Sequence, residues 1–235
     1  MRFAPLAVPE ILGDQVAWID ESSMIEVDRV MIEDLHIELI QMMENAGRHL
    51  ARAVLDGVSP ATVAVAAGSG GNGGGGLVAA RHLANAGVDV TVVTTRPAEA
   101  MGPVPAHQFD ILQRMGVAFR DELPPADATI DAVIGYSLRG APRGASAALI
   151  GAMEAADVVV SLDTPSGLDV TTGATPGAVV MAQATVTLAL PKLGLRNAPS
   201  VGQLYLADIS VPPAVTSAYG SPPPPFGPEG LLRVR

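Results

Sequence analysis

The stretch AGSGGNGGGGLVAARHLANAG, residues 67–87, places seven glycines between positions 68 and 76, interrupted only by Ser69 and Asn72. Glycine loses more backbone entropy on folding than any other residue, so such a dense run indicates a place that only bare backbone can occupy. An apolar run, residues 62–67, precedes it, and residues 77–87 follow with helical spacing and a final Gly87, a helix C-cap signal. The stretch therefore predicts a strand, a glycine turn and a helix.

Strand and helix signals continue to alternate along the chain. The expected strands are residues 62–67, 89–95, 117–120, 128–135, 157–163, 185–190 and 203–209, and the expected helices between them are residues 77–87, 106–115 and 146–156. Such alternation predicts right-handed crossovers and an α/β fold, a doubly wound and mostly parallel sheet with helices on both faces.

The two ends of the chain depart from this alternation. Residues up to about 53 carry apolar side chains at helical spacing, which predicts a helical N-terminal extension. Residues 221–230, SPPPPFGPEG, cannot hold a helix because of their prolines, and we expect them to be extended or disordered. The sequence thus predicts a single domain over residues 1–220 and a Pro-rich C-terminal tail over residues 221–235.

Composition limits the classes of function. The net charge of −10 argues against a nucleic-acid binder, whose affinity comes largely from neutralising phosphates. The lack of cysteine excludes disulfides, a thiolate nucleophile and a cysteine zinc site. The N-terminus shows no signal-peptide pattern, and no apolar stretch reaches the roughly 18 residues of a membrane span. We expect a cytoplasmic protein with no membrane partner.

In an open parallel sheet, ligands bind at the carboxyl ends of the strands, and the glycine run lies at such an end. Its N–H groups and the N-terminus of the following helix can receive an anion without a cationic side chain. Residues 68–73 match the G-x-G-x-x-G dinucleotide pattern only weakly, because Asp89 opens the next strand instead of ending it. A P-loop is excluded because no Lys-Ser/Thr follows, and a loose glycine turn without a ligand is the alternative.

Two further strand ends carry polar residues. Asp131 lies inside an apolar strand, where an unpaired carboxylate is costly, so we expect it to meet a cation or several donors, or else to cap a neighbouring loop. Asp163 ends another strand and opens DTPSGLDV, where Ser166 and Asp169 offer further oxygens. Oxygen ligands without His or Cys suit a hard cation better than zinc or copper.

Together these loops resemble the NAD(P)H-hydrate epimerase family, the YjeF N-terminal domain. GSGGNGGGGLVAARHL (68–83) is similar to the family's GPGNNGGDGLVAARHL, and DTPSGLDVTTG (163–173) is similar to its DIPSGWDV-x-x-G. DAVIGYSLRGAPRG (131–144), TVTLALPKLGL (185–195) and residues 25–47 resemble three more of its segments. The resemblance runs in consistent order over residues 24–209.

The resemblance implies a Rossmann-like domain that interconverts the two C6 epimers of hydrated NADH or NADPH (NADHX and NADPHX). It implies a potassium ion as cofactor, held by Asn72, Asp131 and Ser166. The implied substrate contacts are Asn72, Gly73, Gly74, Gly75, Gly135, Tyr136, Ser137, Leu138, Arg139, Gly140 and Asp163. Epimerisation by loss and readdition of the hydroxyl needs a proton donor and acceptor, for which Asp163 is the candidate, with Lys192 assisting through its charge.

The chain departs from the family pattern at three positions. Gly75 stands where the family has Asp, Gly71 where it has Asn, and Ser137 where it has Gly. Two alternatives therefore stand beside the epimerase: a catalytically impaired member that binds a nucleotide or a protein, and an enzyme with a changed substrate. We also expect any hydrate dehydratase to be a separate partner, and a homodimer through the Met-rich N-terminal helices is a hypothesis.

Overall fold

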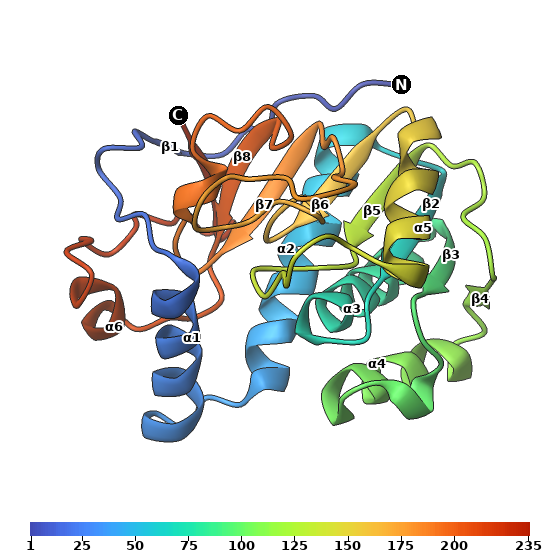
Figure 1. The fold of residues 1–235 in the computed structure, drawn as a ribbon, viewed down its shortest axis with the longest axis horizontal. Helices are drawn as coiled ribbons and strands as arrows, with labels where there is room; N and C mark the ends of the chain where they lie inside the picture. Colours follow the sequence, from blue (N-terminus) through green and yellow to red (C-terminus); the bar gives the residue numbers. More distant parts are fainter.

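Nine strands form one sheet in the order β1-β9-β8-β7-β6-β5-β2-β3-β4 in the computed structural model, which describes residues 1–235 (Figure 1). Every neighbouring pair is parallel except β8 and β9, which are antiparallel. The strands are β1 Glu10–Ile11, β2 Thr62–Ala67, β3 Asp89–Thr94, β4 Ala118–Phe119, β5 Ala128–Ala132, β6 Val159–Leu162, β7 Ala184–Leu188, β8 Gln203–Ala207 and β9 Leu231–Val234. The predicted doubly wound, mostly parallel α/β sheet is confirmed.

Helices cover both faces of this sheet (Figure 1). The α-helices are α1 Glu21–Arg29, α2 Leu39–Val58, α3 Gly71–Asn85, α4 Pro103–Arg114, α5 Gly144–Ala152 and α6 Pro213–Ser217. Side chains of α2, α3 and α4 share a buried cluster with alternate residues of β2 and β5, whereas α5 shares another cluster with Ala66 of β2, Val93 of β3 and Val159 of β6. None of the helices combines the length and apolar character that a bilayer crossing needs.

The strand order places a switch point between β2 and β5. After β2 the chain adds β3 and β4 on one side and then returns to add β5, β6, β7 and β8 on the other. Ligands of open α/β sheets bind outside the carboxyl ends of the strands at such a switch point. The loops that follow β2, β5 and β6 therefore meet where a ligand is expected.

The glycine run differs from the turn that the sequence suggests. We expected the helix to begin at Leu77, but α3 begins at Gly71, so most of the run forms the first turns of the helix. A Cβ on Gly73 would lie 1.8 Å from the carbonyl oxygen of Gly68, a contact that no side chain tolerates. The run thus lets the helix start directly against the end of β2.

Packing accounts for the next glycines as well. A Cβ on Gly74 would lie 2.5 Å from the side chain of Met43 in α2, and one on Gly76 would lie 2.5 Å from Ala132 in β5. Nothing lies within 4 Å of the corresponding point on Gly71. The glycines therefore serve two purposes: Gly73, Gly74 and Gly76 allow close packing of helix, sheet and α2, whereas Gly70 and Gly71 leave open space.

The C-terminal tail differs from the sequence expectation in its last residues. Residues 221–227 form no helix or strand, but Leu231–Val234 form β9, which pairs with both β8 and β1. Leu231 and Leu232 are buried in the core. Their apolar side chains complete the sheet after the prolines end, so this part of residues 221–235 belongs to the domain core.

The N-terminal extension is helical from Glu21 on, as predicted, but residues 1–20 form no helix and include β1. A π-helical turn, Val30–Asp34, follows α1, and the chain then turns into α2. Met24 and Met31 are buried, as are Met42 and Met43 of α2. The methionines of this extension consequently pack against the domain and do not form an exposed face.

Candidate functional site

A cavity of about 1050 Å³ lies at the carboxyl ends of β2, β5 and β6 and is closed on another side by α1 and α2. Its wall contains residues 68–72 after β2, residues 133–137 after β5, and Asp163 after β6. Asp28 of α1 and Met42 of α2 complete the opposite side. This cavity coincides with the switch point of the sheet and has the size of a small-molecule or cofactor site.

Asp163 forms a buried ion pair with Lys192. The Lys192 Nζ donates to Asp163 Oδ1, to the carbonyl oxygen of Leu188 at 2.8 Å, and to the hydroxyl of Thr187 at 3.3 Å. The side chain of Lys192 is 0% exposed and that of Asp163 is 4% exposed. A buried charge is tolerated only when it is paired and hydrogen-bonded, and this pair meets both conditions.

The backbone at Asp163 is left-handed, with φ of 65°. This conformation is uncommon for a residue other than glycine and costs of the order of 1 kcal/mol or more. The strained turn directs the carboxylate into the cavity wall at the point where β6 ends. Strain of this kind concentrates at functional sites, so the geometry supports a functional role for the Asp163 carboxylate.

Asp131 lies fully buried in β5 and has only uncharged donors. Its carboxylate accepts the backbone N–H of Ser166 at 2.8 Å, the Ser166 hydroxyl at 2.5 Å and the Ser161 hydroxyl at 2.8 Å, together with a longer bond from the N–H of Val133. Burial raises the pKa of the Asp131 carboxyl above its ordinary value, against the lowering effect of these donors. The expectation of several donors around Asp131 is met in the structure.

Asn72 lies beside the loop that Ser166 also touches. The Ser166 hydroxyl accepts the N–H of Ile134 at 2.8 Å, and a Cβ on the next residue, Gly135, would lie 3.2–3.3 Å from the Asn72 side chain. The Nδ2 of Asn72 is buried without a hydrogen-bond partner. No hydrogen bond joins Asn72 directly to Asp131 or Ser166, which themselves are in contact.

The oxygen donors of these three residues suit a hard cation. They offer carboxylate, hydroxyl and amide oxygens, and the chain supplies no cationic side chain to the fully buried Asp131 carboxylate. Hard cations prefer oxygen ligands of this kind. No group of three or more His, Cys, Asp or Glu side chains is arranged to hold a metal ion.

Some residues of the loop after β5 line the cavity, and others contact α1. Tyr136 and Ser137 line the cavity, and the Tyr136 hydroxyl donates to Asp28 of α1 at 2.5 Å. Arg139 pairs instead with Glu21 of α1. The loop thus ties α1 to the sheet at two points, and only one of them lies in the cavity wall.

Sequence reasoning missed Asp28. Burial raises the pKa of its carboxyl, against the lowering effects of the Tyr136 hydroxyl and Lys192. The signal was present, because Asp28 shares one helical face with the buried Met24, Val27 and Met31. A carboxylate within an apolar stripe needs a partner, and the partner here comes from a distant loop.

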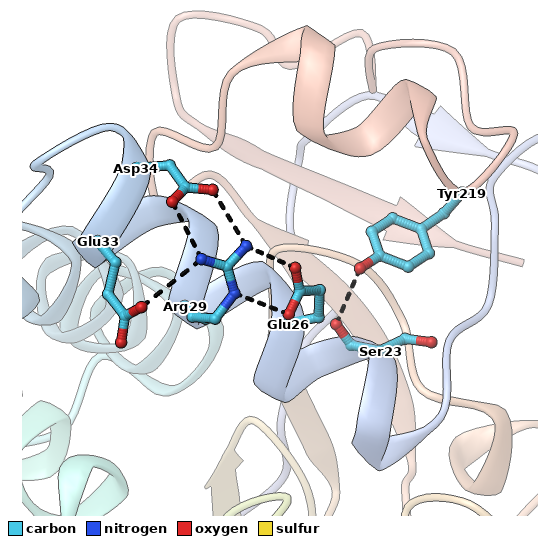
Figure 2. A network of polar contacts seen from close by, with 6 residues as sticks. All are labelled: Ser23, Glu26, Arg29, Glu33, Asp34 and Tyr219. Carbon is cyan, nitrogen blue, oxygen red and sulfur yellow. Dashed lines mark hydrogen bonds and ion pairs between the residues drawn. The ribbon is translucent and has the colours of Figure 1, made fainter.

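Three other carboxylates of this segment form a separate network around Arg29 (Figure 2). Arg29 contacts Glu26 at 2.7 Å, Asp34 at 3.0 Å and Glu33 at 3.6 Å, all on partly or fully exposed side chains. In the same view, the hydroxyl of Tyr219, which follows α6, donates to the carbonyl oxygen of Ser23 at 3.2 Å. Of the acidic residues in α1 and the π-helical turn, Asp28 alone lines the cavity.

The expected site residues fall into three groups in space. The cavity wall contains Asn72, Gly75, Gly135, Tyr136, Ser137 and Asp163. Directly behind the wall lie the buried Asp131, Ser166 and Lys192. Outside the wall lie Gly73, Gly74, Leu138, Arg139 and Gly140, so the structure brings none of these five to the cavity.

Comparison with known proteins agrees with this fold. The family model described as YjeF-related protein N-terminus matches residues 39–194. The chain therefore belongs to the YjeF N-terminal domain family, as the sequence motifs indicated.

The chain is similar to individual members of that family over most of its length. It is 43% identical over 217 residues to an NAD(P)H-hydrate epimerase of Dehalogenimonas lykanthroporepellens, covering 88% of each chain. It is 42% identical over 194 residues to a bifunctional NAD(P)H-hydrate repair enzyme of Hyperthermus butylicus, covering 77% of this chain and 36% of that protein. The fold is also similar to the crystal structure of yeast ynu0, with a TM-score of 0.81 at 21% identity over 93% of this chain and 100% of the other.

Proposed function

We propose that this protein interconverts the two C6 epimers of hydrated NADH and NADPH. The observation that carries the proposal is the Asp163–Lys192 ion pair, whose carboxylate is held by a strained backbone in the wall of the cavity at the switch point. The relatives named NAD(P)H-hydrate epimerase support the same reaction.

The chemistry needs one group that both gives and takes a proton. The Asp163 carboxylate, ion-paired in the resting site, first takes up a proton from solvent and passes it to the C6 hydroxyl. The C6–O bond then breaks, and the ring nitrogen lone pair forms a C6=N iminium as water leaves. Water then adds to the other face and returns a proton to the Asp163 carboxylate, so that atoms and charges balance. Lys192 stabilises the carboxylate between these two steps.

The remaining parts of the site position the substrate. The open backbone of Gly70 and Gly71 at the start of α3 is suited to the pyrophosphate, because the first N–H groups of a helix attract anions. Asn72, Asp131 and Ser166 would hold potassium, which supplies a fixed positive charge beside the buried Asp131 carboxylate. Replacing potassium by sodium at equal ionic strength tests this ion, and we expect the epimerisation rate to fall.

The first experiment measures epimer exchange of purified NADHX with potassium present. We expect exchange by the natural protein, and none by Asp163→Asn that is folded by circular dichroism. Absence of exchange in folded natural protein would contradict the proposal.

Gly75→Asp tests the position where the family carries an acid. A Cβ on Gly75 would lie 2.5 Å from Cδ2 of Leu162, whose flexible side chain must move to admit it. Gly75→Asn is the matched control, because it has the same shape without the charge. Exchange that appears only in Gly75→Asp would identify the natural chain as a catalytically impaired member that binds a ligand or protein.

A changed substrate is the second candidate function, and a specific observation favours it. Gly71 has open space where the family's Asn side chain would stand, and Gly75 lines the same cavity. Exchange of neither NADHX nor NADPHX, together with tight binding of another nucleotide, would support this candidate.

Two partners belong to the proposal. A separate hydrate dehydratase would consume both epimers of NADHX only when this protein is added, which a coupled assay measures.

A homodimer through the N-terminal helices would use the exposed Ile25, Ile32, Leu35 and Ile40 and not the buried methionines. Sedimentation that shows only a 24 kDa species would exclude the dimer. The cytoplasmic location stays a prediction, to be tested by cell fractionation.

A further inference from the structure

The cavity wall has an acidic end and a basic end. Its four charged residues are Asp28, Asp163, Arg96 and Arg143. Asp163 follows β6, whereas Arg96 follows β3, and β5 and β2 lie between those two strands. Three strand spacings separate them, about 14 Å at the usual spacing of roughly 4.8 Å.

The two arginines have no partner within the chain. Neither Arg96 nor Arg143 pairs with a carboxylate, whereas nearby Arg139 pairs with Glu21. Arg143 directly precedes α5, and Leu149 and Ile150 of that helix share a buried cluster with Val93 of β3. The packing of α5 therefore places Arg143 over the same end of the sheet as Arg96.

The position of Arg96 has a known meaning in dinucleotide-binding folds. An acid at the end of the second strand accepts the ribose 2′-hydroxyl of NAD, whereas an arginine nearby accommodates the 2′-phosphate of NADP. Here β3 is the strand beside β2, and it is followed by Thr95 and Arg96 with no acid in that part of the wall. The proposed function places the pyrophosphate at the start of α3, which follows β2 and so lies between the acidic and basic ends.

We infer that Arg96 and Arg143 form a 2′-phosphate site that makes this protein prefer NADPHX over NADHX. The inference rests on the proposed function, because it takes the reacting ring to lie at the Asp163 end of the cavity. The guanidinium groups then meet the phosphate of the adenosine ribose at the other end, through charge-assisted hydrogen bonds.

The test uses NADP⁺ and NAD⁺ as probes in titration calorimetry, with kcat/KM for NADPHX and NADHX measured in parallel. We expect the natural protein to bind NADP⁺ about tenfold or more tightly than NAD⁺, as one lost charged contact of this kind is worth that factor or more. Arg96→Ala should bring the ratio close to one by weakening NADP⁺ alone. Arg96→Asp should reverse the preference, because the acid accepts the 2′-hydroxyl.

Arg120→Ala is the matched control. Arg120 follows β4, the strand next to β3, is exposed, and does not line the cavity, so the ratio should not change. Equal weakening of both probes in Arg96→Ala would place the guanidinium on the pyrophosphate and overturn the inference. Equal affinity of the natural protein for both probes, with epimer exchange intact, would overturn it and leave the proposed function standing. Failure to bind either probe, without exchange, would remove the proposed function itself.

Discussion

Asp163 and Asp131 lie at neighbouring strands of one sheet, and their buried carboxylates are stabilised in different ways. Each is an almost fully buried carboxylate near the carboxyl end of its strand, β6 or β5. Asp163 meets the ammonium of Lys192, which the chain supplies from 29 residues away. Asp131 meets hydroxyl and amide donors only.

The difference indicates how the site divides its charge. The Asp163 carboxylate is neutralised from within, so it can face the cavity as a proton-transfer group. The Asp131 carboxylate has no cationic side chain beside it, and the proposed function assigns that place to a cation from solution. Under that proposal, adjacent strands carry a proton-transfer carboxylate and an ion-binding carboxylate.

Lys192→Met should produce the largest effect. It leaves the Asp163 carboxylate buried without its cation, a change that costs about 3–5 kcal/mol in comparable buried pairs. We expect the free energy of unfolding in urea to fall by that order and epimer exchange to be lost. The double variant Asp163→Asn/Lys192→Met should recover much of the stability and none of the activity, because no buried charge is left unpaired. Equal instability of the single and double variants would contradict the ion-pair account.

Ser166→Ala should have the next largest effect. It removes the hydroxyl bond to Asp131 and the acceptor for the Ile134 N–H, with a cost of about 1–3 kcal/mol. It should also reduce the extra thermal stability that potassium chloride gives over sodium chloride. Ser161→Ala is the matched control, since it also loses a hydrogen bond to Asp131 but is not an expected ligand. Loss of the potassium response in both variants alike would show that Ser166 has no special role.

Asp28→Asn should have the smallest effect of the three substitutions. The effect should be a change in how the free energy of unfolding depends on pH. Because burial raises the folded-state pKa of Asp28, the folded protein binds more protons than the unfolded chain above the ordinary pKa near 3.9. The natural protein therefore loses stability as pH rises from about 4 through the raised pKa, by at most about 1.4 kcal/mol per pH unit. Asp28→Asn lacks this loss. In urea unfolding, the stability of the variant relative to the natural protein should therefore increase as pH rises.

Asp34→Asn is the control of opposite sign. Its bond with Arg29 lowers the pKa of the Asp34 carboxyl, so its contribution to stability is present above the ordinary pKa and is lost as pH falls. The stability of the natural protein relative to this variant should increase as pH rises. The same pH trend in both variants would contradict burial as the dominant influence on the pKa of the Asp28 carboxyl.

The sequence allowed much of the fold to be predicted, because local spacing carries the signal. The apolar run at Thr62–Ala67 has strand length and is β2, and the spacing after the glycines predicts α3 from Leu77 on but not its first six residues, 71–76. Two strands were missed. β9 follows a run of prolines, and β1 has only two residues, so neither has a periodic pattern long enough to read.

The motifs determined which polar residues follow which strands, since Asp131, Asp163, Ser166 and Asn72 stand at the ends of predictable elements. Only the tertiary structure decided their partners. Lys192 contacts Asp163, and Tyr136 contacts Asp28 across 108 residues of sequence. The absence of a side chain at Gly76 of α3 makes room for Ala132 of β5. Local sequence sets the backbone periodicity of each segment, whereas the neutralisation of a buried charge and the fit of a glycine depend on atoms that only the folded sheet brings together.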